Sequence, residues 1–259
     1  MDKIYSEMRE RNLNNVQTKG FSIDNQISHY TAEARDPRRC LALSTFPTYE
    51  WSAEGTRLME TLLKEFGNSP DVVLYEENPA SDVEGEDIRR GKLHWTLMQI
   101  MGFAVYPPEN GRATQSYGES VEALSTGEMG SAFKIHYQGV IAVGTGLVLV
   151  GVCDQDINAA RNTLREGLKE GASEEGGTPF MEPFVNNIVH STILRFSGGD
   201  GQGEIAAKVL SIAKEFESSK LGVGIVDQLR VGECSWRMLE CEIEDTPPCH
   251  VWQLAKSRV

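Results

Sequence analysis

Apolar residues recur along this chain with two spacings, one typical of helices and one typical of strands. Where they lie three or four positions apart they share one helical face, which predicts helices at residues 52–66, 116–125, 156–171 and 205–216. Continuous or alternating apolar runs predict strands, and these occupy residues 40–46, 71–75, 92–103, 133–137, 140–152, 185–196, 221–231 and 236–243. The interleaving predicts an α+β protein with two sheet-and-helix lobes.

Residues 1–37 differ from the rest of the chain because they are polar and weakly patterned. Such a segment is typical of an N-terminal extension, here with one helix near its start. No low-complexity linker interrupts residues 38–259, so we expect them to form one bilobal domain. We expect specificity to lie in the loops of that domain, which are predicted at residues 78–91, 105–115 and 172–184.

Two short segments with the same pattern of residue types lie inside the predicted strands. Residues 93–97 and 189–193 each read apolar, His, any residue, Thr, apolar. Side chains two positions apart in a strand point to the same face, about 6.5–7 Å apart. Each segment therefore presents an imidazole beside a hydroxyl, His94 with Thr96 and His190 with Thr192. The repetition predicts one site built from two similar halves.

These groups fit the cleavage of a phosphate ester. One imidazole can act as the base and the other as the acid, because histidine titrates near neutral pH. The threonine hydroxyls can donate hydrogen bonds to phosphate oxygens while charge develops there. Such a site requires no metal ion or cofactor. The two motifs are nearly equivalent, so the sequence does not tell the acid from the base, and each pair taken alone is also compatible with the solvent face of a strand.

The paired motifs resemble those of the 2H phosphoesterase superfamily, which includes 2′-5′ RNA ligase-like proteins and cyclic nucleotide phosphodiesterases. The resemblance covers about residues 38–256. It extends to Arg195, because a basic residue often stands at this offset after the second motif of that family, whereas Gln99 occupies the same offset after His94. The resemblance implies two pseudo-symmetric lobes, each an antiparallel sheet with helices, around a central cleft that receives one motif from each lobe.

Three further residues have alternative interpretations. Strict alternation from His190 turns Arg195 to the opposite face, so Arg195 is either a surface residue or a phosphate ligand leaning in from the strand end. Tyr137 lies on a strand that can border the cleft, where its ring would stack on a nucleobase or pack in the core. Trp95 alternates away from His94, which predicts a core position.

The net charge of the chain limits which kinds of ligand it is expected to bind. The chain has 259 residues and a formal net charge of −13, which disfavours long duplex nucleic acid but allows a small nucleotide or an oligonucleotide end in a locally positive pocket. The first residues lack the apolar segment of a signal peptide, and the longest apolar stretch, residues 140–152, is too short to span a bilayer. We therefore expect a cytoplasmic location and no membrane partner. The oligomeric state is not predicted.

The five cysteines are expected to be reduced, because their number is odd and no signal peptide precedes them. Four residues near the C-terminus are conceivable zinc ligands: Cys234, Cys241, Cys249 and His250. Their spacing lacks the short pair of cysteines typical of structural zinc sites, so we predict no metal site.

The sequence thus predicts a metal-independent phosphodiesterase that acts on a 2′,3′-cyclic phosphate or a 2′-5′ linkage of a nucleotide or RNA end. His94 and His190 would be its acid and base, while Thr96, Thr192 and Arg195 would hold the phosphate. The alternative is a non-catalytic module that binds a nucleotide or RNA end in the same cleft. Intact His and Thr at all four motif positions argue against that alternative.

Overall fold

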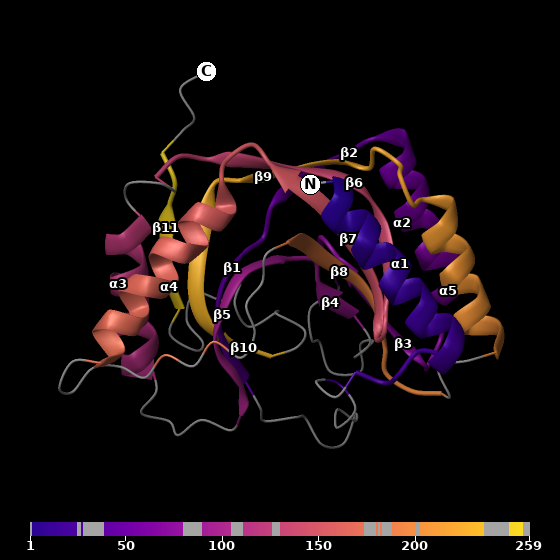
Figure 1. Cartoon of the computed structure of the whole chain (residues 1–259), viewed down its shortest axis with the longest axis horizontal. Coiled ribbons are helices and arrows are strands. Elements are labelled where there is room, and N and C mark those ends of the chain that lie inside the picture. The colour runs from indigo at the N-terminus through magenta and orange to yellow at the C-terminus, as the bar shows by residue number, and fades with distance from the viewer. Residues whose placement is uncertain are drawn as a thin grey trace.

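The computed structural model describes most of the chain, namely residues 2–24, 27, 39–79, 90–104, 111–125, 130–173, 180, 182, 188–199, 203–235 and 249–255. These residues fold into two sheets with helices beside them (Figure 1). The α+β class is therefore confirmed. The expected antiparallel pairing is found throughout both sheets except between β3 and β4, which pair in parallel.

The small sheet has four strands in the order β11-β10-β1-β5, all antiparallel. Their bounds are β1 (Arg39–Thr45), β5 (Trp95–Ala104), β10 (Gln228–Cys234) and β11 (Cys249–Gln253). Helices α3 (Gly111–Ser125) and α4 (Ile157–Ser173) lie beside it, at one end of the molecule (Figure 1). Helix α3 begins earlier than predicted, and the predicted strand at residues 236–243 lies outside the described residues.

The large sheet has seven strands in the order β2-β9-β6-β7-β8-β3-β4. Their bounds are β2 (Thr48–Trp51), β3 (Val72–Glu76), β4 (Arg90–Lys92), β6 (Phe133–Val143), β7 (Gly146–Cys153), β8 (Val189–Phe196) and β9 (Gly222–Val226). Three helices lie at the end of the molecule opposite to α3 and α4 (Figure 1): α1 (Asp2–Lys19), α2 (Ala53–Phe66) and α5 (Gly203–Glu215). The predicted helical stripes of α2 and α5 are buried, as expected for amphipathic helices packed on a sheet.

The first motif does not lie within one strand, contrary to the prediction for residues 92–103. Strand β4 ends at Lys92 in the large sheet, and β5 begins at Trp95 in the small sheet. Leu93 still donates its backbone N–H to Glu76 of β3, so the chain leaves the large sheet here. His94 consequently stands where the chain crosses between the sheets, a position that local apolar patterning does not distinguish from a strand interior.

Helix α1 is packed against the large sheet by one buried aromatic side chain. The Tyr5 hydroxyl donates to the Gly151 carbonyl at 2.6 Å and accepts from the Val189 N–H at 3.1 Å. The same ring packs with Val148 and Val150 of β7. The helix expected near the start of the chain is therefore attached to β7 and β8, close to the second motif.

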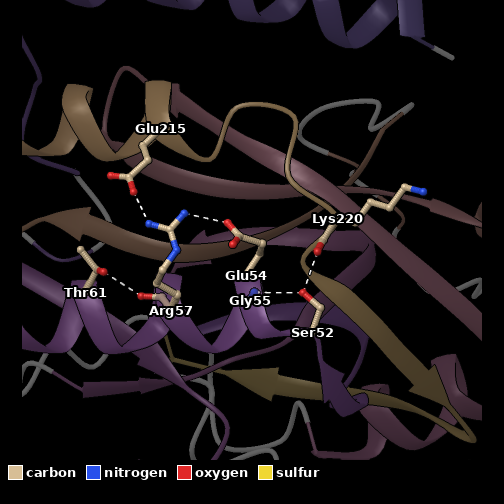
Figure 2. A network of polar contacts seen from close by, with 7 residues as sticks. All are labelled: Ser52, Glu54, Gly55, Arg57, Thr61, Glu215 and Lys220. Atoms are coloured by element: carbon tan, nitrogen blue, oxygen red, sulfur yellow. Dashed lines mark hydrogen bonds and ion pairs between the residues drawn. The ribbon is translucent and has the colours of Figure 1, made fainter.

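A polar network joins α2 to α5 and to the segment before β9 (Figure 2). The Ser52 hydroxyl caps α2 by accepting from Gly55 N–H at 3.1 Å, and it donates to the Lys220 carbonyl at 2.6 Å. Arg57 bridges Glu54, at 2.7 Å, and Glu215 of α5. These contacts fix the helix that precedes β3.

Candidate active site

The second motif strand contains a β-bulge directly after its threonine. In the register of β8 with β7, Ile193 is an extra residue that has no partner residue in β7. A bulge reverses the alternation of the side chains beyond it. Arg195 therefore lies on the face of His190 and Thr192. The expectation from strict alternation, which turned Arg195 to the other face, is wrong for this reason.

Gly146 of β7 makes room for this bulge. It lies opposite Arg195 in the register, and a Cβ atom at Gly146 would come within 1.9 Å of the Leu194 carbonyl oxygen. Any other residue would force the strands apart at this point, so the bulge depends on glycine here.

The first motif strand has the same irregularity at the same offset. In the register of β5 with β1, the extra residue is Leu97, directly after Thr96. Thr96 lies opposite Ser44, and Gln99 lies opposite Ala42. Because Ser44 and Ala42 share one face of β1, Thr96 and Gln99 share a face as well.

The two motifs thus form two geometrically equivalent half-sites. We call His94, Thr96 and Gln99 the first half-site, and His190, Thr192 and Arg195 the second half-site. Strands β5 and β8, although in different sheets, contact each other. All four motif side chains are at least partly buried, with Thr96, His190 and Thr192 retaining some exposure. The structure therefore brings the predicted histidines and threonines into one region.

His94 is held by the backbone and is neutral at ordinary pH. Its Nδ1 atom lies 2.7 Å from the Lys92 carbonyl oxygen, which can only accept, so Nδ1 carries the proton and Nε2 has the free lone pair. Burial lowers the pKa of His94 to about 4, although the Lys92 carbonyl raises it, and the nearby Arg195 and His190 lower it further. Tyr75 and Phe46 surround the ring, at centroid distances of 6.0 and 6.5 Å.

His190 is also neutral, but no backbone group of the described residues holds it. Its Nδ1 atom is buried without a hydrogen-bond partner in that part of the chain. Burial lowers the pKa of His190 to about 4, and the positive charges of Arg161 and Arg195 add to the effect. Both imidazoles therefore lie in a positive field that an anionic ligand would neutralise.

Arg195 is positioned by groups outside the second half-site. Its guanidinium lies 3.4 Å from the Asp24 carboxylate and 5.5 Å from the centre of the Tyr75 ring. It influences both histidines electrostatically. A cation at this place can contribute a charge-assisted hydrogen bond to a phosphate.

Sequence reasoning missed Arg161, a buried arginine of α4 that links the two motif strands. Its Nε donates to the carbonyl of the bulged Leu97 at 2.8 Å, and a terminal nitrogen donates to the Ile188 carbonyl, directly before β8, at 3.0 Å. The side chain is 1% exposed. The sequence could have revealed Arg161 through its spacing. It stands four residues after Ile157 and three before Leu164, on the apolar face of α4, where an arginine is expected to be buried.

Further polar groups continue the first half-site across the small sheet. Ser44, opposite Thr96, lies next to Arg230 of β10 on the same face. The Ser44 hydroxyl is buried without a partner among the described residues. Arg230 and Lys92 both lie over the ring of Phe46, at 5.3 and 6.0 Å. The region of the motifs is thus locally positive, although the whole chain is strongly acidic.

Tyr137 is not brought to the histidines. It is 1% exposed, and its hydroxyl pairs with Ser191, whose side chain alternates away from His190. Its ring packs against Tyr49 at 5.9 Å. This placement fits the packing role and offers no face for stacking on a base. Trp95 is fully buried, as predicted.

The remaining candidates lie elsewhere. His250 pairs with Glu122 at 2.7 Å. The residues that the structure describes contain no group of three or more potential metal ligands. Cys40 and Cys153 are free, whereas Cys234 is disulfide-bonded, so the expectation of reduced cysteines is wrong for Cys234. No helix within the described ranges is long and apolar enough to cross a membrane.

Neither a protein-family model nor a curated protein sequence matches the chain. Similar solved structures include the Thermus thermophilus protein TT0787, at 12% identity, covering 74% of this chain and 86% of that chain with a TM-score of 0.44. Usb1 of Kluyveromyces marxianus, solved with uridine monophosphate, is 9% identical over 85% of this chain and 99% of that chain, with a TM-score of 0.42. LigT of E. coli, solved with 3′-AMP, is 10% identical over 84% and 98%, with a TM-score of 0.39. These proteins belong to the 2H phosphoesterase superfamily, which the paired motifs resemble. At such TM-scores the likeness carries no argument of its own.

Proposed function

We propose that this protein is a metal-independent phosphodiesterase that cleaves a 2′,3′-cyclic phosphate or a 2′-5′ linkage of a nucleotide or RNA end. The observation that carries the proposal is the matched pair of half-sites. Each sets a neutral histidine beside a threonine, and each places the residue five positions after that histidine on the threonine's face through a bulge at the same offset. Accidental motifs would have no reason to share this irregularity.

The imidazoles supply the proton transfers. The hydrogen bond from His94 Nδ1 to the Lys92 carbonyl leaves Nε2 as a lone-pair acceptor, which favours His94 as the base that takes a proton from the attacking water. His190 then protonates the leaving ribose oxygen, as the P–O bond to that oxygen breaks and the bond from water to phosphorus forms.

The phosphate itself sets the protonation state needed for this step. Free of ligand, both histidines have a pKa of about 4, so neither holds a proton near pH 7. An anionic phosphate beside them favours the imidazolium form and raises both values. Thr96 and Thr192 donate to the non-bridging oxygens, and Arg195 supplies the balancing charge.

The alternative is a binding module that holds a nucleotide or RNA end without turnover. A substrate panel separates the two: 2′,3′-cyclic nucleotides and 2′-5′ and 3′-5′ oligonucleotides, incubated with excess chelator, with end-group analysis of the products. The proposal expects cleavage of at least one member at an undiminished rate in chelator. Tight binding without any product would leave only the binding module, and activity restored by zinc or magnesium would indicate metal-ion catalysis.

A further inference from the structure

The two half-sites differ in charge at one equivalent position. Arg195 of the second half-site carries a positive charge, whereas Gln99 of the first half-site carries a neutral amide, and the bulges place both on the face of the motif threonine. A single phosphate needs only one such cation. The group that Gln99 faces is therefore expected to be uncharged.

The side chain of Gln99 is largely buried and its amide is unpaired. The residue is 8% exposed, and its side chain forms no hydrogen bond within the part of the chain that the structure describes. Its amide atoms are nevertheless not among the fully enclosed unpartnered atoms of that part of the chain, so the amide lies at the surface of an otherwise buried residue. An accessible amide without a protein partner, held by a largely buried side chain, is available to hydrogen-bond a ligand on this face of the sheet.

The neighbours of Gln99 across the sheet are small and uncharged. Ala42 of β1 lies opposite it, and Gly232 of β10 follows in the same row. Arg230, a cation on this face of the sheet, lies in the adjacent row with Ser44 and Thr96. On this face of the sheet the positive charge of Arg230 thus lies in the row of Thr96, and the row of Gln99 holds only neutral residues.

We propose that Gln99 determines base specificity by hydrogen-bonding the edge of the substrate's nucleobase, an inference that rests on the proposed function. An amide presents a donor and an acceptor side by side in one plane, which matches the paired donor and acceptor of a base edge. A phosphate offers acceptors only. The substrate then lies across the half-sites, with its phosphate towards Arg195 and its base towards Gln99.

The test compares kcat/KM for the four 2′,3′-cyclic nucleotides in the wild type, in Gln99→Leu and in Gln99→Glu. The wild type should prefer one or two bases. Gln99→Leu should lose about tenfold on the preferred base and less on the others, because one hydrogen bond is removed. Gln99→Glu, which keeps the shape but accepts only, should change the order of preference. Thermal unfolding checks that each variant folds, and Gln99→Glu serves if Gln99→Leu does not.

The matched control is Arg195→Gln, at the equivalent position of the second half-site. It should lower kcat/KM for all four nucleotides by the same factor. Equal losses on all bases in Gln99→Leu, no loss at all, or a wild type without base preference would each overturn the role of Gln99 while leaving the phosphodiesterase intact. A wild type that cleaves neither the cyclic nucleotides nor 2′-5′ oligonucleotides would overturn the proposed function, and the role of Gln99 with it.

Discussion

The two half-sites have the same backbone geometry but different neighbouring residues. Each has a bulge directly after its threonine. His94 stands at the crossover between sheets and is held by a carbonyl, whereas His190 stands within β8 with an Nδ1 that no described residue pairs. The residue opposite Thr96 is Ser44, while Val148, opposite Thr192, is covered by Tyr5 of α1. The repeated backbone geometry thus fixes the positions of the equivalent side chains, whereas the different neighbouring residues give the two half-sites different chemical environments.

The largest effect is expected from removing either histidine. His94→Ala and His190→Ala should each lower kcat/KM by a factor of about 100 to 10,000, because each supplies one proton transfer in the proposed mechanism. The double variant should be little worse than either single variant, since the two act as a unit. His136→Ala, at an exposed position of β6, is the matched control. Near-wild-type rates in one motif variant would mean that only the other half-site is catalytic.

Breaking the link between the half-sites should come next. Arg161→Met leaves two buried carbonyls, of Leu97 and Ile188, without their donor, and we expect a loss of about 2–4 kcal/mol in the free energy of unfolding. Arg161→Lys should lie in between, because one ammonium cannot reach both carbonyls as the guanidinium does. Denaturant titration measures this, with Arg57→Met of the exposed α2 network as the smaller comparison. Unchanged stability in Arg161→Met would show that the strands do not need the link.

A smaller effect is expected from removing the positive charge of Arg195, which distinguishes the second half-site from the first. Arg195→Gln should lower kcat/KM about 10- to 100-fold through a lost charge-assisted contact with the phosphate. It should also raise the pKa of His94 and of His190, because Arg195 now disfavours both imidazolium forms. Histidine titration by NMR measures the shift. Arg9→Gln, a cation of α1 paired with Glu217, controls for a general loss of charge. Unmoved histidine titrations would contradict the positive field described above.

The smallest effect concerns stability and pH. Both histidines have a pKa of about 4 in the folded protein and about 6.5 when unfolded. Between these values the unfolded chain binds more protons, so stability is complete above about pH 6.5 and falls as the pH drops towards 4. From pH 7 to pH 5.5 we expect a loss of about 1 kcal/mol for each histidine. His94→Gln should flatten this dependence, and an identical slope in wild type and variant would show that His94 is not buried neutral.

The lowered values also revise the pH profile that unperturbed histidines predict. Two such histidines would place both limbs of kcat/KM between about pH 5 and 8.5. In the ligand-free protein the histidine that must be protonated loses its proton nearer pH 4. The optimum of kcat/KM should therefore be more acidic than that of kcat, for which bound phosphate has raised both values.

Local pattern was sufficient for the elements and for the motif residues, but not for the irregularities between them. The helix at residues 52–66 and the strand at 40–46 follow from spacing, and α2 and β1 confirm them. The bulges do not follow, because an extra residue is defined only by the partner strand. Strict alternation therefore misplaced Arg195. The sequence distinguishes Gln99 only by its offset from His94, and its position on the face of Thr96 is defined by the register with β1.

The pairing of β1 with β10 joins residues near positions 40 and 234. During synthesis from the N-terminus, β1 cannot form that pair until the residues of β10, almost 200 positions later, have been made. The hairpin of β6 and β7, by contrast, closes over a short turn and can form early. The sheet that carries Gln99 is thus completed later in synthesis than the hairpin of the large sheet.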